Sequence, residues 1–247
     1  ARVGRMDFRL EDWATVDDAR ISYAARVSLA QGIAHTPTLV NARMRRLLAD
    51  GADATAAVVR DSGLRHLPRF WFGVWRAIWS PPFAAGDAAA EAVYLHFRER
   101  HAAMAAGLHA AGVRLHAGTD TLMPYVAPGS SLHGELAELV EAGLTVEAVW
   151  AIATSDAGSW LGVPGLGTLA PGAPADLLFL TSDPRGDLTE LRRIEAVVAD
   201  GRLYRRADLE EALGRYDAHF QGRIYDTAMG AAVSLLQRRF APERGGS

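Results

Sequence analysis

VRLHAGTDTLMPYVAPGSSLHGE, residues 113–135, is the stretch on which the prediction of the fold depends. Its apolar run at 113–117 follows a glycine and predicts a short buried strand, and Asp120 comes where that strand would end. The next segment with helical periodicity starts at Leu132, so a loop of about a dozen residues follows the strand, which is longer than most connections. Binding and catalytic residues concentrate on such loops. Asp120 is therefore either a catalytic candidate or an aspartate that forms a local turn.

A second strand is predicted upstream, at residues 33–40, where β-branched residues are frequent and Pro37 marks the end of the strand or an unpaired position. Asn41 is placed to cap the helix that follows. An alanine-rich helix is then expected over 87–111, with Gly112 as its C-terminal cap. The order strand, helix, strand, loop, helix is the βα repeat of a parallel sheet.

Cap residues predict three more helices. Asp17 precedes an amphipathic segment that Gly32 ends. His133 opens a helix that ends at Gly143, and Thr145 caps the next one. Both of the later helices would flank the parallel sheet.

The composition excludes several classes of function. A net charge of -3 and a pI near 6.3 give no electrostatic signature for binding nucleic acid or an anionic membrane, and no apolar run is long enough to span a bilayer. All 26 basic residues are arginine, so a Schiff-base, P-loop or carbamylated lysine is excluded within this chain. Cysteine is absent as well, which excludes disulfides, thiolate nucleophiles and cysteine-based zinc sites. The chain begins without methionine or a leader, so we expect a processed or truncated product, and the sequence does not decide between a cytoplasmic and an exported protein.

Five short blocks form a further pattern: GTDT at 118–121, LHGEL at 132–136, VEAGLT at 140–145, AIAT at 151–154 and GTLAPGAPADL at 167–177. In this order, and over roughly residues 33 to 204, the chain resembles the C-terminal part of the amidohydrolase superfamily. The resemblance is closest to the imidazolonepropionase-like and Xaa-Pro-dipeptidase-like branch. It implies an α/β fold that contains the last part of a (β/α)8 barrel.

Three parts are expected on this basis. Residues 1–160 would be a partial barrel, because only two of the eight strands that a barrel needs are predicted. Residues 161–205 would be a small β unit with strands at 177–180, 196–198 and 202–204, the last two joined through Asp200 and Gly201 as a two-residue hairpin. The resemblance implies that this unit is part of a β-sandwich completed by N-terminal sequence. Residues 206–247 would be a tail of two helices that dock on the barrel or on a partner chain.

The insert at residues 52–86 carries Trp71, Trp75 and Trp79 at helical spacing, which places three indoles along one helix face. Core packing or a domain contact is the simpler interpretation. The alternative is a lid over a substrate, because the insert lies between the two predicted strands.

The resemblance also assigns candidate site residues. In the family, the aspartate after the last barrel strand binds a catalytic metal or shuttles the proton of the attacking water, and by motif position this residue is Asp120. Thr121 and His133 are candidates for contacting the substrate or supporting Asp120, although a histidine at a helix start can also simply bond locally. His35 is a further candidate. It is interpreted as a pocket-wall or hydrogen-bonded strand histidine rather than a metal ligand, because the chain has no His-x-His and no His-Glu-x-x-His.

The implied cofactor is a divalent metal, zinc by resemblance, with one or two ions in the complete protein. The family places most metal ligands on earlier strands, and none of those motifs occurs here. The implied reaction is hydrolysis of a C–N bond in an amide, a cyclic amide or a dipeptide by a metal-activated water, with a small-molecule amide or peptide as substrate. A homo-oligomer or an N-terminal complement would supply the rest of the fold. The alternative is a non-catalytic half-barrel that serves as an assembly or binding partner.

Overall fold

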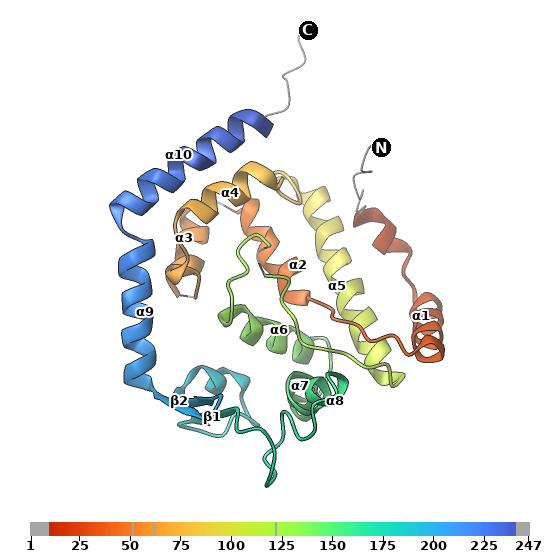
Figure 1. The fold of residues 1–247 in the computed structure, drawn as a ribbon. Helices are drawn as coiled ribbons and strands as arrows, with labels where there is room; N and C mark the ends of the chain where they lie inside the picture. Colours follow the sequence, from red (N-terminus) through yellow and green to blue (C-terminus); the bar gives the residue numbers. More distant parts are fainter. Residues whose placement is uncertain (1–9, 51, 62, 122, 241–247) are drawn as a thin grey trace.

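The fold is mostly helical, and its helices surround two short parallel segments (Figure 1). The computed structural model describes residues 10–50, 52–61, 63–121 and 123–240. The α-helices are α1 Asp18–Gln31, α2 Leu39–Arg45, α3 Ala52–Asp61, α4 Phe70–Ile78, α5 Ala88–Ala110, α6 Ser130–Glu141, α7 Val146–Ala153, α8 Ser155–Trp160, α9 Arg206–Phe220 and α10 Arg223–Phe240. The 3-10 helices are η1 Leu10–Thr15, η2 Arg46–Leu48, η3 Gly63–His66 and η4 Leu188–Arg192, and the strands are β1 Leu177–Leu180, β2 Ile194–Ala199 and β3 Arg202–Arg205. Within these residues, no helix combines the length and the apolarity needed to cross a bilayer.

The two predicted parallel strands do lie side by side, but they pair at a single point. His35 and Leu115 form an isolated parallel bridge. The N–H of His35 donates to the carbonyl of Arg114 at 3.0 Å, and the N–H of His116 donates to the carbonyl of His35 at 2.8 Å. The expected strand at 33–40 is therefore too long, because the chain turns left-handed at Thr38 (φ 54°) and α2 begins at the next residue.

The prediction that Asn41 caps this helix is wrong. α2 starts at Leu39, so Asn41 lies in its first turn. Thr38 occupies the cap position but makes no side-chain cap hydrogen bond. The acceptor for the start of α2 comes instead from Glu135, whose Oε2 accepts the N–H of Val40 at 2.7 Å.

The ends of α1 and α5 follow the predicted cap signals. The carboxylate of Asp17 accepts the N–H of Arg20 at 2.8 Å at the start of α1, and Gly32 ends that helix with a left-handed φ of 62°. α5 ends in the same way, because Gly112 is left-handed and its N–H returns to the carbonyl of His109 at 2.9 Å. The caps at Gly32 and Gly112 therefore fix the points at which the chain leaves α1 and α5 and enters the two parallel segments.

The helices after the Asp120 loop match the predictions except at one boundary. α6 begins at Ser130, three residues before the expected His133, and the chain leaves it through left-handed Gly143 as predicted. Thr145 caps α7 by accepting the N–H of Ala148 at 3.2 Å.

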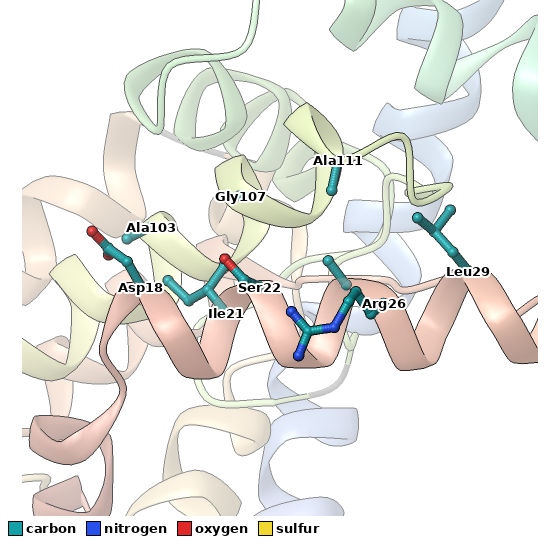
Figure 2. A pocket seen from close by; sticks show the side chains of 9 residues that line it. Asp18, Ile21, Ser22, Arg26, Leu29, Ala103, Gly107 and Ala111 are labelled. Atoms are coloured by element: carbon teal, nitrogen blue, oxygen red, sulfur yellow. The ribbon is translucent and has the colours of Figure 1, made fainter.

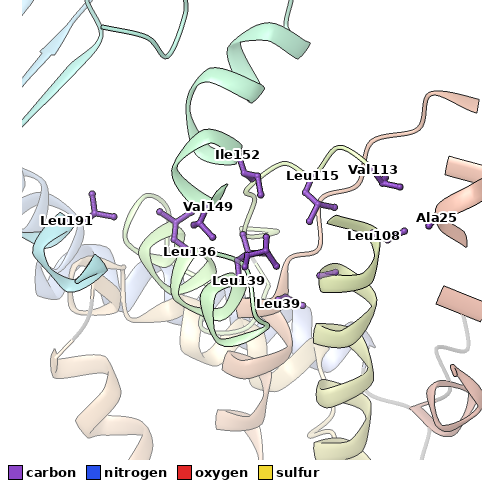
Figure 3. Packing of buried hydrophobic residues seen from close by; sticks show 12 residues of the cluster. Ala25, Leu39, Leu108, Val113, Leu115, Leu136, Leu139, Val149, Ile152 and Leu191 are labelled. Atoms are coloured by element: carbon purple, nitrogen blue, oxygen red, sulfur yellow. The ribbon is translucent and has the colours of Figure 1, made fainter. Parts of the chain in front are cut away.

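A single apolar cluster joins the parallel segments to the surrounding helices. Leu115 from the second segment, Leu39 from α2, Leu139 from α6 and Ile152 from α7 are all almost completely buried in it. Figure 3 shows these side chains converging between the helices. This packing fixes where the second segment ends and where α2 begins.

The aromatic insert forms a second cluster beneath the loop that follows Asp120. Trp75 is 1% exposed, and its ring centroid lies 5.2 Å from that of Tyr125 in the loop. Phe72 lies 6.0 Å from the same ring. Core packing, the simpler of the two interpretations, therefore describes Trp75, and α4 supports the Asp120 loop directly.

The three strands predicted for the small β unit are present, and β2 begins two residues before the expected 196–198. β1, β2 and β3 form an antiparallel three-stranded sheet in that order. Asp200 and Gly201 both have positive φ, 49° and 72°, as a two-residue hairpin turn requires. Asp176 accepts the N–H of Asp200 at 3.2 Å, so its side chain stabilises the hairpin turn between β2 and β3 rather than a turn of its own.

The C-terminal tail forms the two predicted helices and docks on the aromatic insert. Figure 1 shows α9 and α10 as an outer arm that leaves the β unit and returns to α4. His66 Nδ1 lies 2.9 Å from Asp217 Oδ2, and Arg69 pairs with Asp226 at 3.9 Å. The tail thus supports the insert, which in turn supports the Asp120 loop.

Candidate functional site

Asp120 lies just beyond the parallel bridge, at the carboxyl end of the second segment. It is exposed and has a left-handed φ of 54°, a conformation that aspartate tolerates better than most residues. Its carbonyl accepts the N–H of Met123 at 3.0 Å, which starts the turn of the loop. A Cβ atom on Gly118 would lie 2.4 Å from Thr36 Cγ2, so glycine is needed for the two segments to approach this closely. Unusual backbone conformations of this kind concentrate at functional sites.

Asn41 holds the carboxylate of Asp120. Its side-chain amide donates to Asp120 Oδ2 at 3.0 Å, across 79 positions of sequence. No other side-chain hydrogen bond to Asp120 occurs among the described residues. The first turn of α2 therefore sets the orientation of Asp120.

Glu135 on α6 is a buried carboxylate that lies against the start of α2. It has no exposed surface, and its Oε1 has no hydrogen-bond partner among the described residues. Burial raises the pKa of Glu135 to about 7, against the opposing effect of the N–H of Val40, and the nearby carboxylate of Glu138 raises it further. Sequence reasoning missed this residue. The available signal was the placement of Glu135 and Glu138 on the same stripe as the inward-facing Leu139.

The other predicted site residues make no side-chain hydrogen bond to Asp120 within the described ranges. Thr121 is exposed, and its hydroxyl pairs with that of Thr119 at 2.8 Å. His133 is half-buried on α6, and its Nδ1 has no hydrogen-bond partner within the described part of the chain. Burial, and to a smaller extent the positive charge of Arg192, lowers its pKa. His35 Nε2 bonds to Ser28 Oγ at 2.8 Å.

His35 is thus a hydrogen-bonded histidine between the first parallel segment and α1. None of the three predicted residues Thr121, His133 and His35 forms a side-chain hydrogen bond with Asp120 among the described residues. Asn41 does, although the sequence predicted it to be a helix cap.

The donor set does not fit a complete metal centre. Within the described residues, no three histidine, cysteine, aspartate or glutamate side chains gather closely enough to hold a metal ion. A zinc site takes three or four protein ligands. Asp120 offers one carboxylate, and its neighbour Asn41 donates a hydrogen bond to it, so the described residues do not supply a complete zinc ligand set.

A groove of about 390 Å³ lies elsewhere, between α1 and α5 (Figure 2). Ile21, Ala25 and Leu29 from α1 face Gly107 and Ala111 of α5 across it. It shares no residue with the Asp120 arrangement.

Comparison with known families decides the class of this chain. The amidohydrolase family profile matches residues 24–204, a range that contains both parallel segments, Asp120, β1, β2 and most of β3. This chain belongs to the amidohydrolase family. Members of this family are hydrolases, and the predicted resemblance is confirmed. Among curated protein sequences, none matches this amidohydrolase chain significantly.

Several solved amidohydrolase structures resemble the chain. A bottromycin amidohydrolase is 26% identical with a TM-score of 0.55, and the match covers 89% of this chain and 46% of that one. A prolidase complexed with N-methylphosphonate-L-proline is 24% identical with a TM-score of 0.50, over 77% and 38% of the two chains. A Xaa-Pro dipeptidase with methionine bound in its active site is 18% identical with a TM-score of 0.49, over 74% and 37%. The chain thus spans less than half the length of each of these amidohydrolases.

Proposed function

We propose that this chain carries the last catalytic segment of a hydrolase that cleaves a C–N bond in an amide, a cyclic amide or a dipeptide. The observation that carries the proposal is the position of Asp120 at the carboxyl end of a parallel segment, held by Asn41. Barrel enzymes place their catalytic residues at the carboxyl ends of their strands. The similarity to a bottromycin amidohydrolase supports a C–N bond as the target.

Asp120 acts as the proton acceptor in this proposal. The oxygen of a water molecule attacks the carbonyl carbon, Asp120 takes the proton that the water loses, and the same proton passes to the nitrogen as the C–N bond breaks. Asn41 fixes one carboxylate oxygen by donating to it. Thr121 and His133 are proposed to contact the substrate or to support Asp120 from the loop and from α6, and His35 to support the first parallel segment.

The proposal includes a divalent metal in the complete protein, because the amidohydrolase superfamily generally uses such ions. Zinc is proposed by resemblance, with Asp120 as one ligand. The remaining ligands would come from polypeptide other than the described residues, which hold no suitable group of side chains.

The first test is Asp120→Asn in a protein that contains the complete catalytic domain. Turnover of a panel of proline dipeptides, N-acyl amino acids and cyclic amides should be abolished, while the circular dichroism spectrum stays unchanged. Asp176→Asn is a matched control, since Asp176 is an exposed aspartate of the β unit that accepts the N–H of Asp200. Activity retained in Asp120→Asn would refute the assignment.

Elemental analysis of the purified chain, with and without added zinc, tests the metal. A stoichiometric ion that is lost in Asp120→Ala would support an Asp120 site completed by an oligomer. A chain without metal would place the ligands on a longer protein or on a complementing polypeptide.

A non-catalytic half-barrel is the second candidate, and the single bridge between the parallel segments favours it. Such a chain would act by assembling with a second copy or with an N-terminal complement. Analytical ultracentrifugation of the chain alone, and with a polypeptide that carries the earlier barrel units, separates the two functions. Assembly without turnover supports the half-barrel, whereas turnover that appears on assembly supports the hydrolase.

A further inference from the structure

We propose that Glu135 is a positioning residue for Asp120 and acts through the first turn of α2. The inference rests on the proposed hydrolase function, in which Asp120 is the reacting group. Among the described residues, Glu135 makes no hydrogen bond to Asp120 or to the loop that carries Asp120.

The first step is that α2 depends on Glu135 for its start. The first N–H groups of any helix lack partners within that helix. Thr38 would normally supply an acceptor, but its left-handed backbone leaves its side chain without a cap hydrogen bond. The carboxylate of Glu135 on α6 takes this role, because its Oε2 accepts the N–H of Val40 at 2.7 Å.

The second step is that α2 and α6 are held in close contact. A Cβ atom on Gly134 would lie 2.9 Å from Val40 Cγ2, closer than real Cβ contacts allow. One turn further along, Glu138 pairs with Arg43 of α2 at 3.1 Å and with Arg98 of α5 at 3.1 Å. Glycine at position 134 therefore lets the carboxylate reach Val40, and Glu138 holds the other end of α2.

The third step is that the residue after Val40 is the one that holds Asp120. Asn41 donates to Asp120 Oδ2 at 3.0 Å, and no other side-chain bond fixes that carboxylate among the described residues. A shift of the first turn of α2 therefore moves the amide of Asn41, and with it the carboxylate of Asp120.

Burial makes this arrangement rigid. Glu135 has no exposed surface, so water cannot replace it as the acceptor for Val40. The charged groups around it are Glu138 on its own helix, and Arg43 and Arg98, which neutralise Glu138 from α2 and α5.

The test uses nuclear magnetic resonance of the full chain with ¹⁵N labelling. Glu135→Met removes the acceptor and keeps the volume, whereas Glu135→Gln keeps an acceptor oxygen. In Glu135→Met we expect the side-chain amide signals of Asn41 to move to their positions in Asp120→Ala, and the backbone amide of Val40 to exchange about tenfold faster. Glu135→Gln should keep the wild-type signals.

Val149→Ala is the matched control, because it removes buried methyl groups from α7 in the same core without touching the carboxylate. It should lower the stability and leave the signals of Asn41 unchanged. Gly134→Ala keeps the carboxylate but pushes against Val40, so it should move the same signals and serves if Glu135→Met does not fold. The proposal would be overturned if the signals of Asn41 stayed in place in both Glu135→Met and Gly134→Ala. It would also be overturned if they moved equally in Val149→Ala.

A kinetic readout in the complete catalytic domain completes the test. Glu135→Met should lower kcat by about tenfold with little change in KM, and Glu135→Gln should restore most of the loss. A wild-type protein without turnover would count against the hydrolase assignment alone, because the resonance measurements need no substrate.

Discussion

The side-chain amide of Asn41 donates to Oδ2 of Asp120 at 3.0 Å, and so joins the first turn of α2 to the end of the neighbouring parallel segment. Both residues lie just past the bridge between His35 and Leu115. The carboxylate is exposed, and this hydrogen bond restrains its orientation. A reacting group held in one orientation loses less freedom when it meets its substrate.

Replacing Asn41 by Leu should therefore slow the reaction more than it weakens binding. The loss of one hydrogen bond to a carboxylate corresponds to about 1–2 kcal/mol, so kcat should fall by roughly five- to thirtyfold while KM changes little. Steady-state kinetics in the complete catalytic domain measure this effect. An unchanged kcat would show that Asp120 does not depend on Asn41.

Glu135 should make the folded chain less stable as the pH rises. Its pKa is raised by burial from 4.5 to about 7, so the native state binds the proton more tightly than the unfolded chain does. The stabilising contribution is complete below pH 4.5 and is lost as the pH rises through about 7, by on the order of 3 kcal/mol. Urea unfolding of the wild type and of Glu135→Gln, from pH 5 to pH 8, should show the variant gaining relative stability with pH.

His101 should have the opposite effect. Its ring is stacked on Phe97 with centroids 5.5 Å apart and lies 5.1 Å from Trp13, and burial lowers its pKa from 6.5 to about 4. The native state then binds fewer protons than the unfolded chain, so stability is present above pH 6.5 and is lost as the pH falls towards 4, by on the order of 3 kcal/mol.

The variant His101→Leu should remove this acid sensitivity. In the wild type, Glu135 and His101 change the stability in opposite directions between pH 4.5 and 6.5, so the stability should depend little on pH in this range. The pH dependence should appear when either residue is replaced. A His101→Leu variant with the wild-type acid response would contradict the assignment.

Tyr125→Phe should stabilise the chain slightly. The hydroxyl of Tyr125 is buried in the aromatic cluster and has no hydrogen-bond partner among the described residues. Removing an unsatisfied buried hydroxyl gains about 1 kcal/mol, whereas the ring contacts with Trp75 and Phe72 are kept. A lower unfolding midpoint in denaturant would mean that the hydroxyl has a partner.

Local signals in the sequence predicted a large part of the fold. Asp17, Gly32 and Thr145 were recognised because a cap is a contact between residues three or four positions apart. The hairpin at Asp200 and Gly201 was recognised for the same reason, since its backbone conformation depends on those two residues. The loop that carries Asp120 follows the bridged Leu115, as the sequence predicted.

The interactions that were missed are long-range. The role of Asn41 depends on Asp120, 79 positions away, and the start of α2 depends on Glu135, 95 positions after Val40. Asn41 was predicted to be a helix cap because asparagine is one of the residues preferred at the N-cap position. The strand at 33–40 was overestimated because β-propensity describes a residue that fits a sheet, whereas within the described ranges this segment pairs with its neighbour at a single bridge.

The bond between Glu135 and Val40 also has a consequence for biosynthesis. A chain leaves the ribosome N-terminus first, and at about 5–20 residues per second the 95 positions that separate the two residues take about 5 to 20 s to make. During that interval the residues of α2 lack the acceptor for the N–H of Val40. The final orientation of Asp120 therefore cannot form before Glu135 is made, and a nascent chain stalled before Glu135 would carry the aspartate without its final geometry.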